Sequence, residues 1–212
     1  MLRTCVYYTA KYLCLIALKL YNRLSVKGLD KIPEQRPIII AANHTSNLDP
    51  VVIGCIFPGR LRPLAKIELF QMNPVFTWLI TMLGSIPVSR ESGKEAAKAL
   101  RRFLELLKNG ENLMIFPEGG RSRDGRVKPL EGGVAVLATS TDAPIVPLYI
   151  AGTWEAMPMG ARFIKPARIT AYFGDPIMPL PKEQRGSLKE ERERIRLALQ
   201  NKLQQMEKEI IG

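Results

Sequence analysis

The segment NHTSNLDP, residues 43–50, holds the only histidine of the chain, and an aspartate follows it five positions later. His44 and Asp49 are the residue types of a general base and of the acid that orients it. Side chains at this separation do not share one face of a helix, so the chain must turn between them for the carboxylate to reach the ring. The alternative is structural: Asp49 before Pro50 is typical of a helix start, with Asp49 as the N-cap and His44 as a loop residue.

A second polar stretch, PEGGRSRDG at residues 117–125, combines glycines with arginines. Glycine lets the backbone approach a ligand closely, and the guanidinium groups of Arg121 and Arg123 are forked donors suited to phosphate. The stretch is not a Walker A loop, because the Gly-Lys-Ser/Thr ending is missing. The alternative is a solvated turn that carries ordinary surface arginines.

Both polar stretches follow apolar runs that are typical of buried strands. PIIIAA at residues 37–42 precedes the histidine segment, and NLMIF at residues 112–116 precedes the glycine-rich one. Ligands tend to bind beyond the carboxyl ends of the strands in an α/β sheet. The two stretches are therefore candidate sites by their position as well as by their residue types.

Strands and helices alternate along the rest of the chain. Strands are predicted within residues 60–66, 84–90, 143–152 and 168–173, and helices at residues 51–57, 73–83, 91–110, 133–140 and 187–211. Ser92 and Glu95 are expected to form a capping box at the start of the helix at 91–110. The pattern predicts the α/β class: a single domain, residues 25–212, with a mixed, mainly parallel sheet flanked by helices.

Residues 1–24 are apolar and aromatic, but Arg3, Lys11, Lys19 and Arg23 are spread through them. Lys11 and Lys19 interrupt the run of about 20 apolar residues that a spanning helix needs. We expect a membrane-associating helical segment in the membrane interface, with its cations reaching lipid phosphates and its tyrosines at headgroup level. The alternative is a terminal helix packed on the core of the domain.

Composition narrows the choice of partners. The net charge of +11 and the pI of about 9.8 favour an anionic partner: nucleic acid, an anionic lipid surface or a phosphorylated substrate. Three cysteines do not make a secreted disulfide framework, which favours a reducing cytosolic setting. With one histidine and no cysteine pair at ligand spacing, the sequence predicts no metal site.

Four stretches together are far more specific than any one of them. NHTSNLDP, GSIPVSR at 84–90, FPEGGRSRDG at 116–125 and IVPLYI at 145–150 occur in this order. They resemble the four motifs of the glycerolipid acyltransferase family, which includes the 1-acylglycerol-3-phosphate acyltransferases, over about residues 25–180. The resemblance implies transfer of a fatty acyl group from a thioester to the sn-2 hydroxyl of 1-acylglycerol 3-phosphate (lysophosphatidic acid), which gives phosphatidic acid in phospholipid synthesis.

The resemblance also implies roles for individual residues. His44 would be the general base and Asp49 the residue that orients it. Substrate-binding residues, most of them in the second and third motifs, would be Lys66, Arg90, Glu118, Gly119, Arg121 and Ser122. The chain departs from the family where Pro87 replaces an aromatic residue and Gly120 replaces a threonine. These departures bear on the identity of the acceptor.

The implied reaction needs two substrates and a membrane. The acyl donor would be a thioester of coenzyme A or of acyl carrier protein, as a co-substrate, with no cofactor and no metal. The lipid acceptor and the basic composition favour an anionic membrane surface as partner, at the cytoplasmic face of the cell membrane in a peripheral or monotopic position. An acidic acyl carrier protein would be attracted by the same positive field.

Other functions remain to be weighed. Within the family, the acceptor could be glycerol 3-phosphate or another lysolipid. A non-catalytic, basic membrane-binding module also fits the charge, whereas aromatic-interleaved basic stretches and nucleic-acid motifs are missing, so no nucleic acid is expected. A hydrolase could use Ser46 or Ser122 as nucleophile, but neither serine lies in a Gly-x-Ser-x-Gly elbow.

Overall fold

The computed structural model of the 212-residue chain describes residues 2–35, 37–71, 74–82, 84–88 and 93–211. Its α-helices are α1 (Leu2–Tyr21), α2 (Asp49–Ile56), α3 (Pro74–Met82), α4 (Gly93–Lys108), α5 (Gly133–Thr141), α6 (Thr153–Ala156) and α7 (Leu188–Ile211). Its strands are β1 (Ser25–Lys27), β2 (Ile39–Ala42), β3 (Leu64–Lys66), β4 (Ile86–Val88), β5 (Leu113–Ile115), β6 (Ile145–Ala151) and β7 (Thr170–Phe173). Short 3-10 helices cover Leu29–Lys31 (η1), Ile67–Gln71 (η2) and Lys182–Gln184 (η3).

The main sheet has five strands in the order β1-β7-β6-β2-β5. β6, β2 and β5 are parallel to one another, and β7 runs antiparallel to β6 and parallel to β1. Ile39 of β2 pairs with Leu113 of β5 on one side and with Ile145 of β6 on the other. The sheet is therefore mixed and mainly parallel, as predicted, while β3 and β4 form a separate parallel pair.

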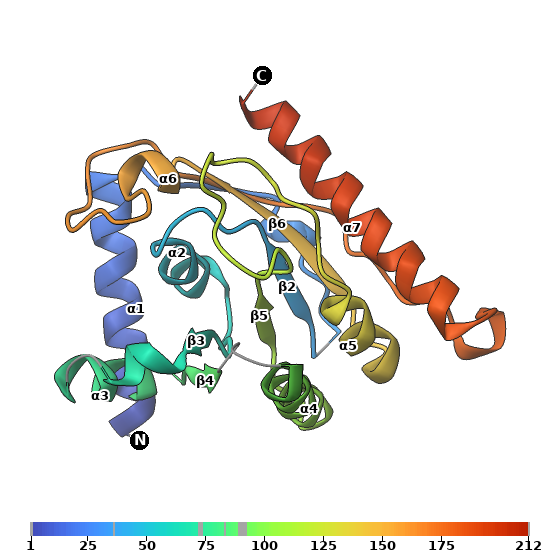
Figure 1. The fold of residues 1–212 in the computed structure, drawn as a ribbon. Helices are drawn as coiled ribbons and strands as arrows, with labels where there is room; N and C mark the ends of the chain where they lie inside the picture. The colour runs from blue at the N-terminus through green and yellow to red at the C-terminus, as the bar shows by residue number, and fades with distance from the viewer. Residues whose placement is uncertain (1, 36, 72–73, 83, 89–92, 212) are drawn as a thin grey trace.

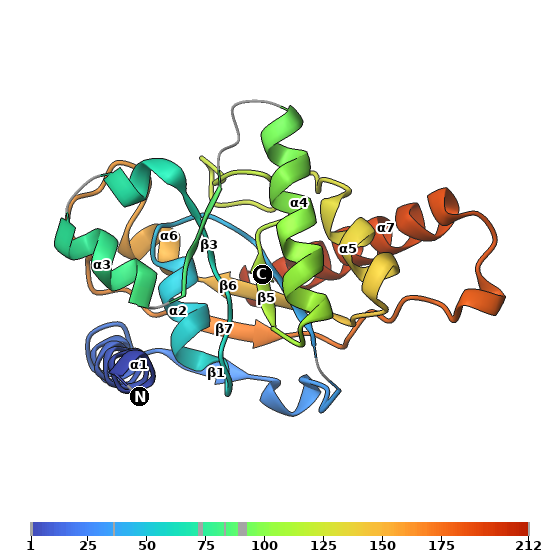
Figure 2. The ribbon, with the colours of Figure 1, turned by 90° about the horizontal axis from the view of Figure 1, so that it is seen from below.

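Helices cover both faces of the sheet, which is why β2 is buried throughout its length (Figures 1 and 2). Ile40 and Ala42 belong to a core that includes residues of α1 and α2, and Ile39 and Ala41 belong to a second core shared with α4, α5 and α7. Side chains alternate between the faces of a strand, so one apolar run supplies both cores.

The predicted helices and strands occur close to their expected bounds, including α4, whose Phe103 and Leu107 are buried. The expected capping box at Ser92 lies outside the described residues. β1 was not predicted from the sequence. It has only three residues, none of them buried, and among the described strands of the main sheet it pairs only with β7, so no buried apolar run marks it.

α1 packs one of its faces against the domain and leaves another exposed. Tyr7, Lys11 and Leu18 are buried, and the Lys11 ammonium group donates hydrogen bonds to the carbonyl oxygens of Phe57 and Gly59. The expectation that all cations and tyrosines of this segment face lipid is wrong for Lys11 and Tyr7. Lys11 turns inward because the carbonyl groups at the end of α2 supply it with acceptors.

The exposed face of α1 is apolar and aromatic. It carries Tyr12, Leu13, Ile16, Leu20 and Tyr21, all more than half exposed. Within the described ranges, no helix combines the length and the hydropathy needed to cross a membrane. The alternative of a terminal helix packed on the core of the domain is thus confirmed for one face of α1. Membrane association through the exposed apolar face stays a prediction.

Candidate active site

The two polar loops lie together at one edge of the sheet. β2 and β5 are neighbouring parallel strands, so the loops after them, residues 43–48 and 116–131, start from the same edge. The N–H of Ser122 in the second loop donates to the carbonyl oxygen of His44 in the first, at 2.7 Å. The predicted placement of both stretches beyond the carboxyl ends of their strands is confirmed.

Asp49 contacts the histidine ring rather than capping its helix. Its Oδ2 lies 2.8 Å from Nδ1 of His44 and also accepts the N–H groups of Thr45 at 2.7 Å and Ser46 at 2.8 Å. α2 begins at Asp49, and its N-cap is Leu48, which makes no side-chain capping bond. The interpretation of Asp49 as an N-cap acceptor is therefore wrong, because its carboxylate points back into the tight turn that connects it to the histidine.

Burial strengthens the interaction between the two side chains. Asp49 is fully buried, whereas the His44 side chain is 16% exposed. A buried carboxylate at Nδ1 favours the tautomer that carries its proton there and would stabilise the ring after it takes a second proton. The ring also stacks on Phe116, with centroids 3.9 Å apart and planes 16° apart, so its orientation is fixed from two sides.

The other ring nitrogen is available for chemistry. Nε2 of His44 has no hydrogen-bond partner among the residues that the structure describes. A neutral imidazole whose Nδ1–H is held by a carboxylate has its lone pair on Nε2, where it can accept a proton from a hydroxyl group. The geometry is that of an oriented general base whose Nε2 faces no hydrogen-bond partner in the part of the chain that the structure describes.

Glu118 lies behind the histidine loop. Its Oε1 accepts the backbone N–H of His44 at 3.0 Å, and its Oε2 accepts the backbone N–H of Lys128 at 3.3 Å. Burial raises the pKa of Glu118 to about 7, although the two N–H donors and the Lys128 ammonium group oppose that rise. These contacts make Glu118 a link between the loops, and a role in binding substrate stays a prediction.

Gly119 and Ser122 also shape the second loop. Gly119 has φ 70°, and a Cβ atom there would overlap the carboxylate of Glu131. Ser122 is fully buried, and its hydroxyl donates to Asp124 Oδ1 at 2.6 Å. Both residues thus hold the loop in shape, and their part in binding the acceptor stays a prediction.

Neither serine proposed as a hydrolase nucleophile is placed for attack. Ser46 is fully buried, and its hydroxyl donates to the carbonyl oxygen of Met157 at 2.7 Å. The Ser122 hydroxyl is committed to Asp124 in the same way. Both hydroxyl groups serve the internal structure of their loops, which weighs against the hydrolase alternative.

The structure describes the side chain of only one of the three predicted phosphate-binding cations. Arg121 is half-buried, and its guanidinium group makes no hydrogen bond or ion pair with any described residue. Lys66 is the last residue of β3, but its side chain is outside what the structure describes, and Arg90 lies outside the described residues altogether. Sequence reasoning missed Lys128, whose ammonium group donates to the carbonyl oxygen of Gly120 at 3.2 Å.

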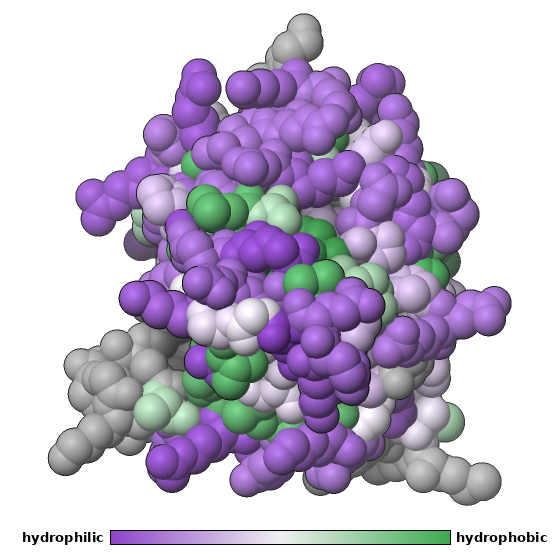
Figure 3. All heavy atoms as spheres, turned by 90° about the vertical axis from the view of Figure 1, so that its right-hand side faces the viewer, coloured by the Kyte–Doolittle hydropathy of each residue, from purple (hydrophilic) through white to green (hydrophobic). Residues whose placement is uncertain are grey.

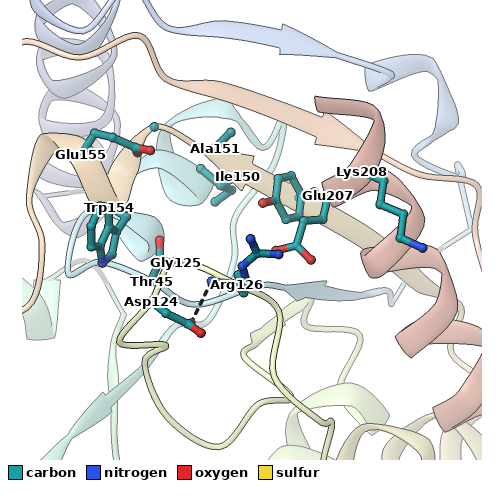
Figure 4. Close-up of a pocket in the computed structure, with 12 residues that line it drawn as sticks. Thr45, Asp124, Gly125, Arg126, Ile150, Ala151, Trp154, Glu155, Glu207 and Lys208 are labelled. Atoms are coloured by element: carbon teal, nitrogen blue, oxygen red, sulfur yellow. Dashed lines mark hydrogen bonds between the residues drawn. The ribbon is translucent and has the colours of Figure 1, made fainter. Parts of the chain in front are cut away.

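A cavity of about 530 Å³ opens beside this site, at the end of β6 (Figure 4). Thr45, the residue after His44, lines it, as do residues 149–152, which include the last two residues of the fourth motif. Trp154 and Glu155 of α6 and Arg126 of the second loop also border it. The described residues predicted for the site do not line this cavity, so it adjoins the His44–Asp49 pair without containing it.

Two positioning residues were not predicted. Phe116 supports the ring of His44, and Asn43 joins the end of β2 to β6 by accepting the Ile150 N–H at 2.7 Å and donating to the Ile150 carbonyl oxygen at 2.9 Å. Asn43 is the first residue of NHTSNLDP, and Phe116 is the first residue of FPEGGRSRDG. Their place within these two motifs was the available signal.

The structure is that of an α/β domain that carries a histidine oriented by a carboxylate and, beside it, an arginine-bearing loop. Comparison with known proteins identifies the family to which this domain belongs. Residues 23–151 match the model of the acyltransferase family. The chain belongs to this family, which confirms the resemblance based on the four motifs.

Relatives of this chain are named as 1-acyl-sn-glycerol-3-phosphate acyltransferases. It is 31% identical over 159 residues to a chloroplastic 1-acyl-sn-glycerol-3-phosphate acyltransferase of Brassica napus, covering 74% of this chain and 46% of that protein. It is 31% identical over 131 residues to the human 1-acyl-sn-glycerol-3-phosphate acyltransferase alpha, covering 60% of this chain and 45% of that one. The chain thus spans about half the length of these curated relatives.

A solved structure extends the likeness over almost the whole chain. The crystal structure of the 1-acyl-sn-glycerophosphate acyltransferase PlsC from Thermotoga maritima matches with a TM-score of 0.78 and 28% sequence identity. The match covers 97% of this chain and 81% of that one. The fold predicted from the alternation of strands and helices is therefore the fold of a solved acyltransferase.

Proposed function

We propose that this protein transfers a fatty acyl group from an acyl thioester to the sn-2 hydroxyl of 1-acylglycerol 3-phosphate, giving phosphatidic acid. The observation that carries the proposal is the 2.8 Å contact between His44 Nδ1 and Asp49 Oδ2, with Nε2 left unbonded among the described residues. Support also comes from the family match and from relatives whose names state this reaction.

In the proposed mechanism, His44 Nε2 removes the proton of the acceptor hydroxyl as that oxygen attacks the thioester carbonyl carbon. Asp49 holds the ring and balances its charge while it is protonated. When the tetrahedral intermediate collapses, the C–S bond breaks, and the imidazolium returns its proton to the departing thiolate. A thiolate is a good leaving group, so the transfer does not require an acyl-enzyme.

The phosphate of the acceptor would be held by cations. Arg121 is the candidate that the structure describes best, because its guanidinium group has no partner among the described residues. Lys66 and Arg90 are proposed to join it on the strength of the motifs alone. A phosphate gripped in this way places the hydroxyl beside His44, and such positioning supplies a large part of the rate enhancement.

We further propose that residues 1–24 form a membrane-associating segment on the acyltransferase domain of residues 25–212. The exposed apolar face of α1 supports this, as does the net charge of +11. The enzyme would work at the cytoplasmic face of the membrane, where the thioester donor, carried by coenzyme A or by acyl carrier protein, is available. Anionic lipids attract each nearby lysine or arginine by about 1 kcal/mol.

The decisive experiment uses purified protein in detergent micelles with an acyl thioester and 1-acylglycerol 3-phosphate. Thiol release and phosphatidic acid are followed together, for wild type and for His44→Ala, with the fold of each checked by circular dichroism. We expect equal amounts of thiol and phosphatidic acid from wild type and almost none from the variant.

Two control reactions make the result specific. Glycerol 3-phosphate in place of the lysolipid tests the alternative acceptor, and omission of any acceptor tests hydrolysis. Phosphatidic acid formation at the same rate by folded His44→Ala would refute the assigned role of His44. Thiol release without an acceptor would point to hydrolysis instead.

A further inference from the structure

The loop that follows α6, residues 157–168, lies against the C-terminal end of α1 (Figure 1). The Tyr21 hydroxyl donates to the carbonyl oxygen of Ile164 at 3.2 Å, and the Asn22 side chain donates to the carbonyl oxygens of Lys165 at 3.1 Å and Ala167 at 3.3 Å. Asn22 is itself 2% exposed. These contacts join a loop and a helix that are more than 140 residues apart in sequence into one surface.

The tip of this loop presents apolar side chains to solvent. Phe163 is 81% exposed, and Met159 and Ile164 are 43% and 41% exposed. At the adjoining end of α1, Leu20 is 79% exposed. Apolar side chains gathered at one place on a surface mark an interaction site, in contrast to single exposed residues scattered over a protein.

The charged side chains within the loop and within the N-terminal segment are all cationic. Residues 157–168 contain Arg162, Lys165 and Arg168 but no aspartate or glutamate, and residues 1–24 contain no acidic residue either. Exposed apolar tips between cations, with no carboxylate among them, complement a surface that is anionic outside and apolar beneath. An acidic protein would satisfy the cations but would leave Phe163 and Leu20 without an apolar environment.

The opposite side of the molecule has a different character. Figure 3, which views the side of α7, shows a surface dominated by hydrophilic residues. α1 and the loop after α6 lie away from α7, on the other side of the sheet (Figure 1). α3, which packs beside α1, adds Trp78, which is 50% exposed. The exposed apolar side chains of α1, of α3 and of the loop after α6 therefore lie away from the hydrophilic surface at α7.

We infer that residues 157–168 form a second membrane-inserting element beside α1, in which Phe163 enters the headgroup region of an anionic bilayer. The inference deepens the proposed function, since the same bilayer would supply the lipid acceptor. The loop also borders the candidate active site: the Ser46 hydroxyl, two residues after His44, donates to the carbonyl oxygen of Met157 at 2.7 Å. Insertion of the loop would place the His44 loop close to the bilayer surface.

The test measures vesicle binding, which does not depend on catalysis. Sedimentation with vesicles of phosphatidylcholine and phosphatidylglycerol gives the bound fraction of wild type, Phe163→Asp, Phe163→Leu and a matched control, Leu197→Asp. Leu197 is 45% exposed on α7, on the opposite side, so its variant carries the same added charge away from the loop. We expect Phe163→Asp to bind about tenfold more weakly and the other two variants to bind like wild type.

A second variant tests the cationic part of the surface. Arg162→Glu should weaken binding to the anionic vesicles and should have little effect with vesicles of phosphatidylcholine alone, because only the former attract the cation. Acyl transfer by Phe163→Asp in detergent micelles should equal that of wild type, which separates this inference from the proposed chemistry.

Several results would overturn the inference. The first is that the wild-type protein does not bind the anionic vesicles. The second is that Phe163→Asp binds them as well as wild type does. The third is that Leu197→Asp loses as much vesicle binding as Phe163→Asp. The fourth is that a second copy of the chain, and not a bilayer, binds to this surface. In that case Phe163→Asp would convert a dimer to a monomer in sedimentation velocity while vesicle binding stayed the same.

Discussion

The carboxylate of Glu118 accepts the backbone N–H of His44 at 3.0 Å, and it does so from the loop that follows the neighbouring strand. Its other oxygen accepts the backbone N–H of Lys128 at 3.3 Å. A buried carboxylate with both oxygens engaged in this way fixes how the two loops of the candidate site lie against each other. The arginine-bearing loop and the histidine loop are thus held in one arrangement before any substrate binds.

Glu118 should make the stability of the protein depend on pH. Burial raises the pKa of Glu118 to about 7 from the usual 4.5. Between pH 4.5 and pH 7 the native state therefore binds more protons than the unfolded state does. The free energy of unfolding consequently falls as the pH rises through this range. At about 1.4 kcal/mol per tenfold change in proton affinity, the contribution is roughly 3 kcal/mol. Urea unfolding at about pH 5 and about pH 8 should show a smaller difference for Glu118→Gln than for wild type. An unchanged difference would contradict this assignment.

Replacing Asp49 by asparagine should lower kcat while leaving KM for the acceptor nearly unchanged. Asparagine keeps an oxygen for the N–H groups of Thr45 and Ser46 but removes the charge that supports a protonated His44. We expect a fall in kcat of about a hundredfold or more. Asp175→Asn, at a carboxylate whose side chain is 63% exposed, is the control. Wild-type turnover by a folded Asp49→Asn protein would mean that His44 acts without this partner.

Arg121→Ala should raise KM for 1-acylglycerol 3-phosphate. Loss of a charge-assisted contact to phosphate predicts an increase of about tenfold or more. Arg123→Ala, at an exposed arginine two positions further along the loop, should change KM little. With a monoacylglycerol acceptor, which has no phosphate, wild type and Arg121→Ala should become equal. A loss of the same size with that acceptor would show that Arg121 supports the fold of the loop instead.

Lys11→Met should destabilise the protein more than Lys19→Met does. Lys11 is 8% exposed, and its ammonium group donates to the carbonyl oxygens at the end of α2, whereas Lys19 on the same helix is exposed. Burial also lowers the pKa of Lys11. We expect a loss of about 1–3 kcal/mol for Lys11→Met in urea unfolding. Equal stabilities of the two variants would show that the buried contacts contribute little.

Much of the fold could be predicted because its central strands are buried on both faces. β2 and β6 are continuous apolar runs, and such runs are visible in the sequence without any knowledge of their neighbours. The helix α4 was equally clear from the spacing of Phe103 and Leu107. β1 was missed, because a three-residue strand with no buried residue leaves no such pattern.

The pair of His44 and Asp49 could be predicted as a set of residue types and a spacing, but its geometry could not. A histidine and an aspartate five residues apart are compatible with a helix cap as well as with a base and its partner. The turn between them decided the question, since Asp49 Oδ2 accepts the N–H groups of Thr45 and Ser46 together with the ring nitrogen. That outcome depends on backbone angles that residue types alone do not specify.

By itself, then, the sequence determined the fold class, the positions of the polar loops at strand ends and the spacing of His44 and Asp49. Tertiary structure alone decided that Lys11 points inward, that Glu118 supports the His44 loop, and that the loop carrying Phe163 lies beside α1. The physical reason is the same in each case. These contacts join residues between 46 and 143 positions apart, and the order of strands and the packing of helices bring them together, not their local sequence.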